Sequence, residues 1–385
     1  MTEKKHQGVM SPEEAQSQTI DLLRFPLAVM VIYSHIAIEA PVPAQLGATP
    51  PLSAADLHYI LELILTDLLT KVPVFYFISG LLFFLTMRQW SWLGYKKKMR
   101  RRLQALLIPY LMWNITTFFI FVAVQILLKG EPLSYAWAMF AEQNWHVVWD
   151  CNEWGTDRVN WLGGSLRTTG PFDTPLWFLR DLMVVSALSP LIYCFIRRTR
   201  IYGMALLSLA YISRIWPVAT GFSVTAVFFF SLGAYFAING INVIHFVQRT
   251  KYVVIVSFLA LLAACIAYNG EHTVIGQNIY PFFAIATVFV SFYAASVFVT
   301  RWNVKANKFL VSSCFFVYAF HDSPTGNPLG ISNTILHFVI PGSSALENAV
   351  CYLLSPFLAA AICVFILLLL KKFTPRLAKL YSGNR

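Results

Sequence analysis

The chain has 385 residues, of which 57% are hydrophobic and only 12% are charged, and its mean hydropathy is +0.62. Soluble domains carry about 25% charged residues, so this composition excludes a soluble globular enzyme. It predicts an all-α polytopic membrane protein, because a chain this apolar satisfies its backbone within helices. The six cysteines form no CxxC pair and lie mostly in apolar runs, which argues against a disulfide framework or a metal site.

Ten apolar runs are long enough to cross a bilayer, whose hydrocarbon core needs about 20 helical residues. In chain order they are 20–38, 60–87, 103–128, 176–196, 202–219, 222–240, 252–269, 279–299, 309–340 and 347–370. The second run is long and contains Pro73. The ninth is interrupted by HDSPTGNPLG (321–330), whose prolines preclude an unbroken helix.

Lysine and arginine predict the orientation of these spans. With the N-terminus in the cytoplasm, the inner segments hold 22 of the 29 basic residues and the outer segments hold four. This positive-inside asymmetry predicts cytoplasmic termini, and it explains the net charge of +11 without a nucleic-acid partner. We therefore divide the chain into an N-terminal tail (1–19), a membrane domain (20–370) and a C-terminal tail (371–385).

The largest outer segment, 129–175, is rich in acidic residues and tryptophans, but nothing in it indicates an independent domain. Its acidic residues are Glu131, Glu142, Asp150, Glu153, Asp157 and Asp173. Its tryptophans, which we interpret mainly as residues of the membrane interface, are Trp137, Trp145, Trp149, Trp154 and Trp161.

The first span, DLLRFPLAVMVIYSH (21–35), carries an arginine and a histidine, and ionisable residues at bilayer depth indicate function. Eleven residues advance a helix by three turns plus about 20°, so Arg24 and His35 are expected on one face, about 16.5 Å apart. Asp21 shares that face and can pair with Arg24. The alternative is that Arg24 snorkels to the lipid surface while His35 bonds a neighbouring helix.

A second histidine is expected at a similar depth. By helical rise, His35 lies about 22 Å above residue 20, and His321 lies about 18 Å above residue 309, beside the break in its span. Two imidazoles at similar depth predict a shared polar cavity. The alternative for His321 is a helix-end residue that caps loose carbonyl groups.

The Arg-x10-His pattern of the first span resembles the signature of the membrane acyltransferase-3 family, and four further stretches resemble family elements in the same order. They are VFYFISGLLFF (74–84), RRLQALLIPY (101–110), TPLWFLRDLMVVSALSPLIY (174–193) and YAFHDSP (318–324). The resemblance covers nearly the whole chain. Pro26 departs from the family, which commonly has glycine nearby, and the sequence shows no appended esterase-like domain.

The resemblance implies that an acyl group, usually acetyl, is transferred from acyl-CoA to a hydroxyl of an envelope or exported glycan or glycolipid. The implied setting is a bacterial cell membrane with its lipids, no metal is implied, and an oligomer is compatible with it. In this interpretation His35 is the general base, and Arg24 binds a donor phosphate or pins the cofactor arm. His321 supports the oxyanion or passes the proton on, and Asp21 supports Arg24.

The resemblance also suggests residues that bind the donor. Arg101 and Arg102, in the basic run at the inner mouth, can hold nucleotide phosphates, and Ser79 precedes a glycine that permits close backbone approach. The alternatives are that the basic run is only a topology signal and that Ser79 belongs to small-residue helix packing.

Trp177, Arg180 and Asp181, at the outer start of the fourth span, suit a sugar ring and its hydroxyls. The alternative is an interfacial tryptophan beside a salt bridge at the helix start. For the whole protein, the alternative function is a transporter or flippase for an envelope lipid or glycan, which shares the broken helix and intramembrane polar residues. The sequence shows no inverted repeat, which favours the enzyme.

Overall fold

A computed structural model describes residues 10–36, 53–69, 71–87, 90–159, 165–213, 219–324, 326–340 and 344–383. Side chains are described for these residues except at positions 54, 67, 152–159, 165–168 and 271. Of the outer-segment residues named above, Trp161 therefore lies outside the described residues, and Glu153, Trp154 and Asp157 are described by their backbone alone.

The described chain is almost entirely helical, as its composition predicted. The first eight helices are α1 (Pro12–Tyr33), α2 (Ala54–Glu62), α3 (Lys71–Leu85), α4 (Trp92–Arg102), α5 (Ile108–Lys129), α6 (Leu133–Gln143), α7 (Trp177–Ala187) and α8 (Ser189–Ile212). The remainder are α9 (Val224–Ile238), α10 (Val243–Arg249), α11 (Lys251–Ala267), α12 (Val274–Thr300), α13 (Lys308–Phe320), α14 (Pro328–Val339), α15 (Ala345–Phe373) and α16 (Pro375–Ser382).

Short turns and one hairpin complete the fold. Two π-helical turns are η1 (Leu63–Leu68) and η2 (Leu103–Leu107), and three 3₁₀ turns are η3 (Asn144–Val148), η4 (Thr174–Leu176) and η5 (Gly270–His272). Strands β1 (Asn152–Val159) and β2 (Ser165–Gly170) form an antiparallel hairpin within the outer segment. This hairpin is the one departure from the predicted all-α class among the described residues.

Among the described residues, four helical stretches are long and apolar enough to cross a membrane, and up to six if each of two bent pairs forms one span. The four are Ala55–Leu85, Trp92–Lys129, Val274–Thr300 and Ala345–Phe373. The polytopic class is therefore confirmed, whereas the expected ten spans are not established by length and composition. Several expected spans are shorter or bent, because α11 and α13 have only 17 and 13 residues.

Two breaks in the apolar runs follow from local sequence. Lys308–Phe320 and Pro328–Val339 are separate helices, so the interruption predicted within 309–340 is confirmed. Helices α7 and α8, which cover the expected span 176–196 and part of 202–219, contain two bends. Pro190 follows the 61° bend between α7 and α8, and Arg200 adopts a non-helical φ of 50° near the predicted break at 197–201.

The core lies where α3 crosses α9. A Cβ added to Gly80 would meet the Phe230 carbonyl oxygen at 2.0 Å, and one added to Gly233 would meet that of Phe77 at the same distance. Only glycine therefore permits this backbone approach. Phenylalanines fill the space around the crossing, because large apolar rings bury the most area per residue.

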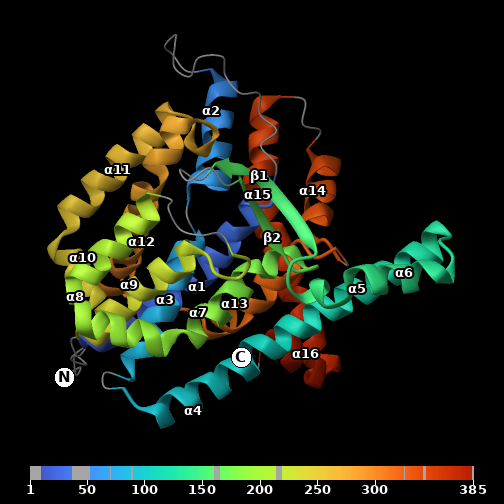
Figure 1. Cartoon of the computed structure of the whole chain (residues 1–385). Helices are drawn as coiled ribbons and strands as arrows, with labels where there is room; N and C mark the ends of the chain where they lie inside the picture. Colours follow the sequence, from blue (N-terminus) through green and yellow to red (C-terminus); the bar gives the residue numbers. More distant parts are fainter. Residues whose placement is uncertain are drawn as a thin grey trace, which may run out of the picture.

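Figure 1 shows how the segments around this core are arranged. α5 and α6 extend away from the body of the molecule, and α4 runs along its lower edge. The predicted C-terminal tail includes a helix, α16, which packs against α5. Trp113 Nε1 donates to the Tyr381 carbonyl at 3.1 Å, and the Thr116 and Tyr381 hydroxyls are 2.7 Å apart.

Candidate active site

The ends of two helices bring two histidines together. α1 ends at Tyr33, and His35 lies in the following turn, where its backbone N–H bonds the Ile32 carbonyl at 3.0 Å. His321 is the C-cap of α13. The two imidazole rings meet edge-on, with centroids 4.8 Å apart and planes at 75°. The sequence placed both at similar depth, and the structure makes them direct neighbours.

Asp322 orients the imidazole of His35. The Asp322 Oδ2 atom lies 3.0 Å from His35 Nδ1. A carboxylate oxygen only accepts, so Nδ1 carries the proton and the lone pair remains on Nε2. Sequence reasoning missed Asp322, although its signal was present as an acidic residue beside His321 in the interrupted span.

His321 uses its other nitrogen to close α13. Its Nδ1 lies 2.9 Å from the Tyr318 carbonyl oxygen and 3.2 Å from that of Val317, so this nitrogen also carries a proton. The helix-cap contact predicted as an alternative is therefore present. The Nε2 atom is buried and has no hydrogen-bond partner among the described residues. It retains a lone pair beside the ring of His35.

Lys71 holds the turn that carries His35. Its Nζ donates to the carbonyls of Leu65 and Thr66 at 2.8 and 2.9 Å and to the Ser34 hydroxyl at 3.3 Å. The ammonium group thus joins η1 to the residue before His35. Sequence analysis did not single out Lys71, because its partners come from segments whose packing the sequence does not reveal.

The expected pair of Arg24 and Asp21 is confirmed. Arg24 Nη1 lies 3.0 Å from Asp21 Oδ1, and both side chains are about one-third exposed. Arg24 precedes the last residue of α1 by nine positions, or about 13.5 Å along the axis. Arg24 therefore lies well before His35 along the axis of α1, and the two side chains are not in direct contact.

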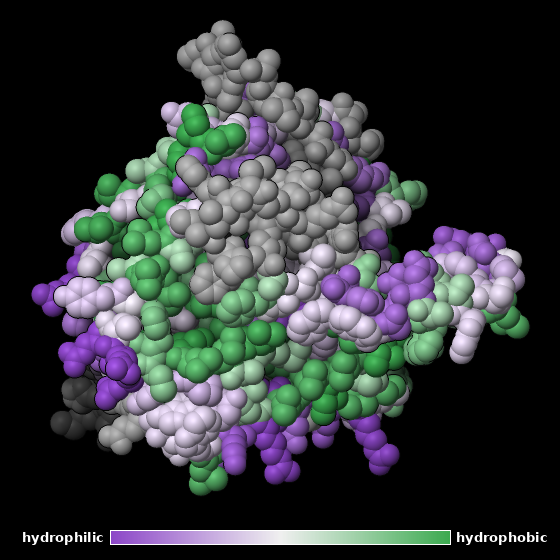
Figure 2. Space-filling model, viewed as in Figure 1, coloured by the Kyte–Doolittle hydropathy of each residue, from purple (hydrophilic) through white to green (hydrophobic). Residues whose placement is uncertain are grey.

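Of the residues expected to bind the donor, Arg101 and Arg102 lie on α4 and Ser79 lies on α3. Arg101 is exposed, whereas Arg102 turns inward and its Nη2 donates to the Ser79 carbonyl at 3.1 Å. The Arg102 guanidinium also lies 4.9 Å from the centroid of Phe83. Ser79 precedes Gly80 at the α3–α9 crossing, so the small-residue packing named as its alternative is present. Hydrophilic side chains line the lower edge of the molecule, where α4 lies (Figure 2).

The residues expected to bind the acceptor are buried at the start of α7. Arg180 and Asp181 are each 3% exposed and form an ion pair at 3.0 Å. Arg180 Nη1 also donates to the Trp149 carbonyl at 2.6 Å. The helix-start salt bridge given as the alternative is therefore formed, and it ties α7 to the outer segment. Trp177 is partly buried against the core.

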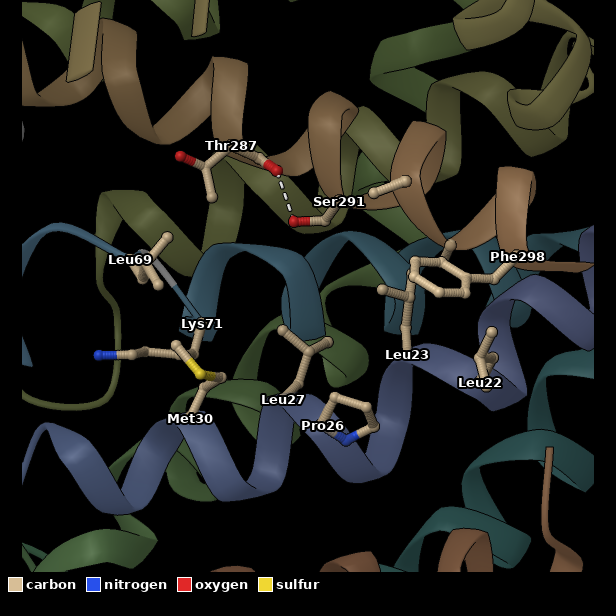
Figure 3. A pocket seen from close by; sticks show the side chains of 12 residues that line it. Leu22, Leu23, Pro26, Leu27, Met30, Leu69, Lys71, Thr287, Ser291 and Phe298 are labelled. Atoms are coloured by element: carbon tan, nitrogen blue, oxygen red, sulfur yellow. Dashed lines mark hydrogen bonds between the residues drawn. The ribbon is translucent and has the colours of Figure 1, made fainter. Parts of the chain in front are cut away.

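A cavity of about 300 Å³ lies on another side of α1 (Figure 3). Its walls come from α1, α3 and α12 and are mainly apolar, with Leu27, Met30 and Phe298 among them. The Ser291 hydroxyl donates to the backbone carbonyl of Thr287, one turn earlier on α12, at 2.7 Å. The cavity suits hydrocarbon and does not include the histidines.

Buried His321, partly exposed His35 and the Asp322 carboxylate form a group of side chains that can exchange protons, inside a bundle of apolar helices. Among the described residues, no group of three histidine, cysteine or acidic side chains can hold a metal ion. The chain belongs to the acyltransferase-3 family, described as "Acyltransferase domain", which matches residues 18–371. It is therefore an acyltransferase.

A curated relative supports this assignment. The chain is similar to the succinoglycan biosynthesis protein ExoH of Rhizobium meliloti (strain 1021), with 26% identity over 96% of this chain and 92% of the relative. No solved structure matches the chain.

Proposed function

We propose that the protein transfers an acetyl group from acyl-CoA on the cytoplasmic side to a hydroxyl of an envelope or exported glycan. The observation that carries the proposal is the His35–Asp322 pair beside His321, within a chain of the acyltransferase-3 family. The ExoH relative is named for succinoglycan biosynthesis, which supports a glycan as the acceptor.

His35 acts as the general base in this proposal. Its Nε2 lone pair takes the proton of the acceptor hydroxyl as the oxygen attacks the thioester carbonyl carbon. Asp322 stabilises the imidazolium that forms and keeps the ring in one tautomer. The proton then passes to the departing thiolate sulfur, so the products are an ester and free CoA. A thioester is already activated, so no covalent acyl-enzyme is required.

The positions of the charged residues support a reaction in which the two substrates enter from opposite ends of the protein. Arg24 lies about 13.5 Å before the end of α1, a separation suited to the long cofactor arm. Arg101, exposed on α4, and Arg102 contribute positive charge to the nucleotide end. Trp177 and the Arg180–Asp181 pair lie at the end of the outer segment, on the acceptor side.

The proposal is tested with sealed membrane vesicles of known orientation that contain the protein. Radiolabelled acetyl-CoA is supplied to one face only, and label is measured in the glycan fraction. We expect transfer only when the donor meets the cytoplasmic face. Transfer with the donor confined to the outer face would contradict the orientation, and no transfer from either face would contradict the proposed reaction.

A further inference from the structure

Among the described residues, the site contains two bases, and the tyrosine hydroxyls near them are already engaged. The Nε2 atoms of both histidines carry lone pairs, and Asp322 accepts from His35. The nearby tyrosine hydroxyls already donate to backbone carbonyls. Tyr318 donates to Pro175, Tyr76 to Phe178 at 3.4 Å, and Tyr33 to Leu353 at 2.8 Å. An oxyanion needs hydrogen-bond donors, so a further polar group among the described residues is a candidate for this role.

Asp173 is a buried carboxyl beside this site. Its side chain is fully buried, and neither carboxyl oxygen has a hydrogen-bond partner among the described residues. Its backbone N–H donates to Asn114 Oδ1 at 2.9 Å, which fixes it to α5. One turn further along α5, Thr117 bonds the hydroxyl of Ser323, the residue after Asp322, at 3.3 Å. Asp173 is thus held between α5 and the end of α13.

The surroundings of Asp173 favour its neutral form. Burial and the nearby carboxylate of Asp322 both raise the pKa of Asp173 well above its usual range. The Arg180 guanidinium, in the next helix, is engaged by Asp181 at 3.0 Å. Among the described residues, the titratable groups that interact electrostatically with Asp173 are Tyr110, Tyr318 and Asp322.

We propose that Asp173 is a catalytic residue that acts as a neutral carboxylic acid and donates a hydrogen bond to the thioester oxygen as this becomes an oxyanion. The role rests on the proposed acyl transfer. The acceptor oxygen forms the new bond to carbon, and the carbonyl π electrons move to oxygen, where the Asp173 O–H stabilises them. When the carbon–sulfur bond breaks, the electrons return and His35 protonates sulfur. Asp173 keeps its proton throughout.

Substituting the carboxyl by an amide separates this role from a structural one. The amide of Asp173→Asn still donates a hydrogen bond but does not titrate. Asp173→Ala removes the hydrogen-bond donor as well as the titrating group. We expect Asp173→Ala to lower turnover by about 10²–10³-fold, the usual cost of one oxyanion donor. Asp173→Asn should lose roughly tenfold or less on that scale. The exposed acid Glu142 in the same outer segment gives a matched control, Glu142→Gln, which should retain wild-type turnover.

The pH profile provides the second readout. The protonated acid is the active form, so wild-type turnover should fall as the pH rises through the raised pKa of Asp173. Asp173→Asn should lose this alkaline decline. Turnover is measured as label from radiolabelled acetyl-CoA in the glycan fraction of native membranes, per folded molecule by fluorescence-detected chromatography.

The possible results separate the two hypotheses. If the wild type transfers label and Asp173→Ala does so at the same rate, the role of Asp173 is overturned and the proposed function is unaffected. An alkaline decline that persists unchanged in Asp173→Asn would also overturn it. Absence of transfer by the wild type would instead refute the proposed function itself.

Discussion

Replacing Asp322 by asparagine tests whether His35 is an oriented base. In the present site, Nδ1 of His35 donates to Asp322 at 3.0 Å, which leaves the lone pair on Nε2. An asparagine can turn its NH₂ toward Nδ1. That nitrogen must then accept, so the proton moves to Nε2 and the lone pair needed for catalysis is lost.

The expected magnitude follows from the burial of the pair. In fully buried serine–histidine–aspartate sites this substitution lowers turnover about 10⁴-fold. The side chains of His35 and Asp322 are 19% and 34% exposed, so water compensates part of the loss. We therefore expect a decrease of about 10²–10³-fold, equivalent to about 2.7–4.1 kcal/mol in the activation free energy.

The assay is label transfer from acetyl-CoA in native membranes, normalised to folded protein. His146 and Asp150 form a second histidine–aspartate pair in the outer segment, again through Nδ1, and the Asp150→Asn variant is the matched control. It should keep wild-type turnover. If Asp322→Asn stays within about threefold of the wild type, the orienting role and the tautomer assignment are both wrong.

Four further outcomes test the site and the fold. His35→Ala should reduce transfer by about 10²–10⁴-fold with normal expression, and more than about a tenth of wild-type turnover would exclude it as the base. Arg24→Lys should fail almost as badly as Arg24→Ala in donor-dependent kinetics, because lysine lacks the planar fork; full rescue would reduce Arg24 to a topology charge. His321→Ala should lower turnover sharply and leave donor binding unchanged, whereas a pure cap would lose only about 1 kcal/mol in a melting curve. Gly80→Ala should destabilise the protein by about 1–3 kcal/mol in thermal unfolding, because its Cβ would meet the Phe230 carbonyl at 2.0 Å; an unchanged melting temperature would contradict the crossing.

The sequence alone determined the helical membrane class, the family resemblance and the Arg24–Asp21 pair. These features depend on composition, on order along the chain and on neighbours within one helix, where a three-residue spacing fixes the geometry. The sequence also located the break after His321, because Pro324 and Pro328, four positions apart, interrupt a helix. The depth estimate for the two histidines was useful because the rise per helical residue is constant.

Only the tertiary structure decided which polar residues meet. Asp322 and His35 are 287 positions apart, and Lys71 reaches Ser34 from another helix. No local sequence pattern predicts contacts between residues so far apart along the chain. Asp173 illustrates the same point, since in the sequence it is one of six acids in the outer segment, and only the tertiary structure shows that its side chain is fully buried. The cost of burying a carboxyl group depends on every neighbour at once, and those neighbours are set by the fold.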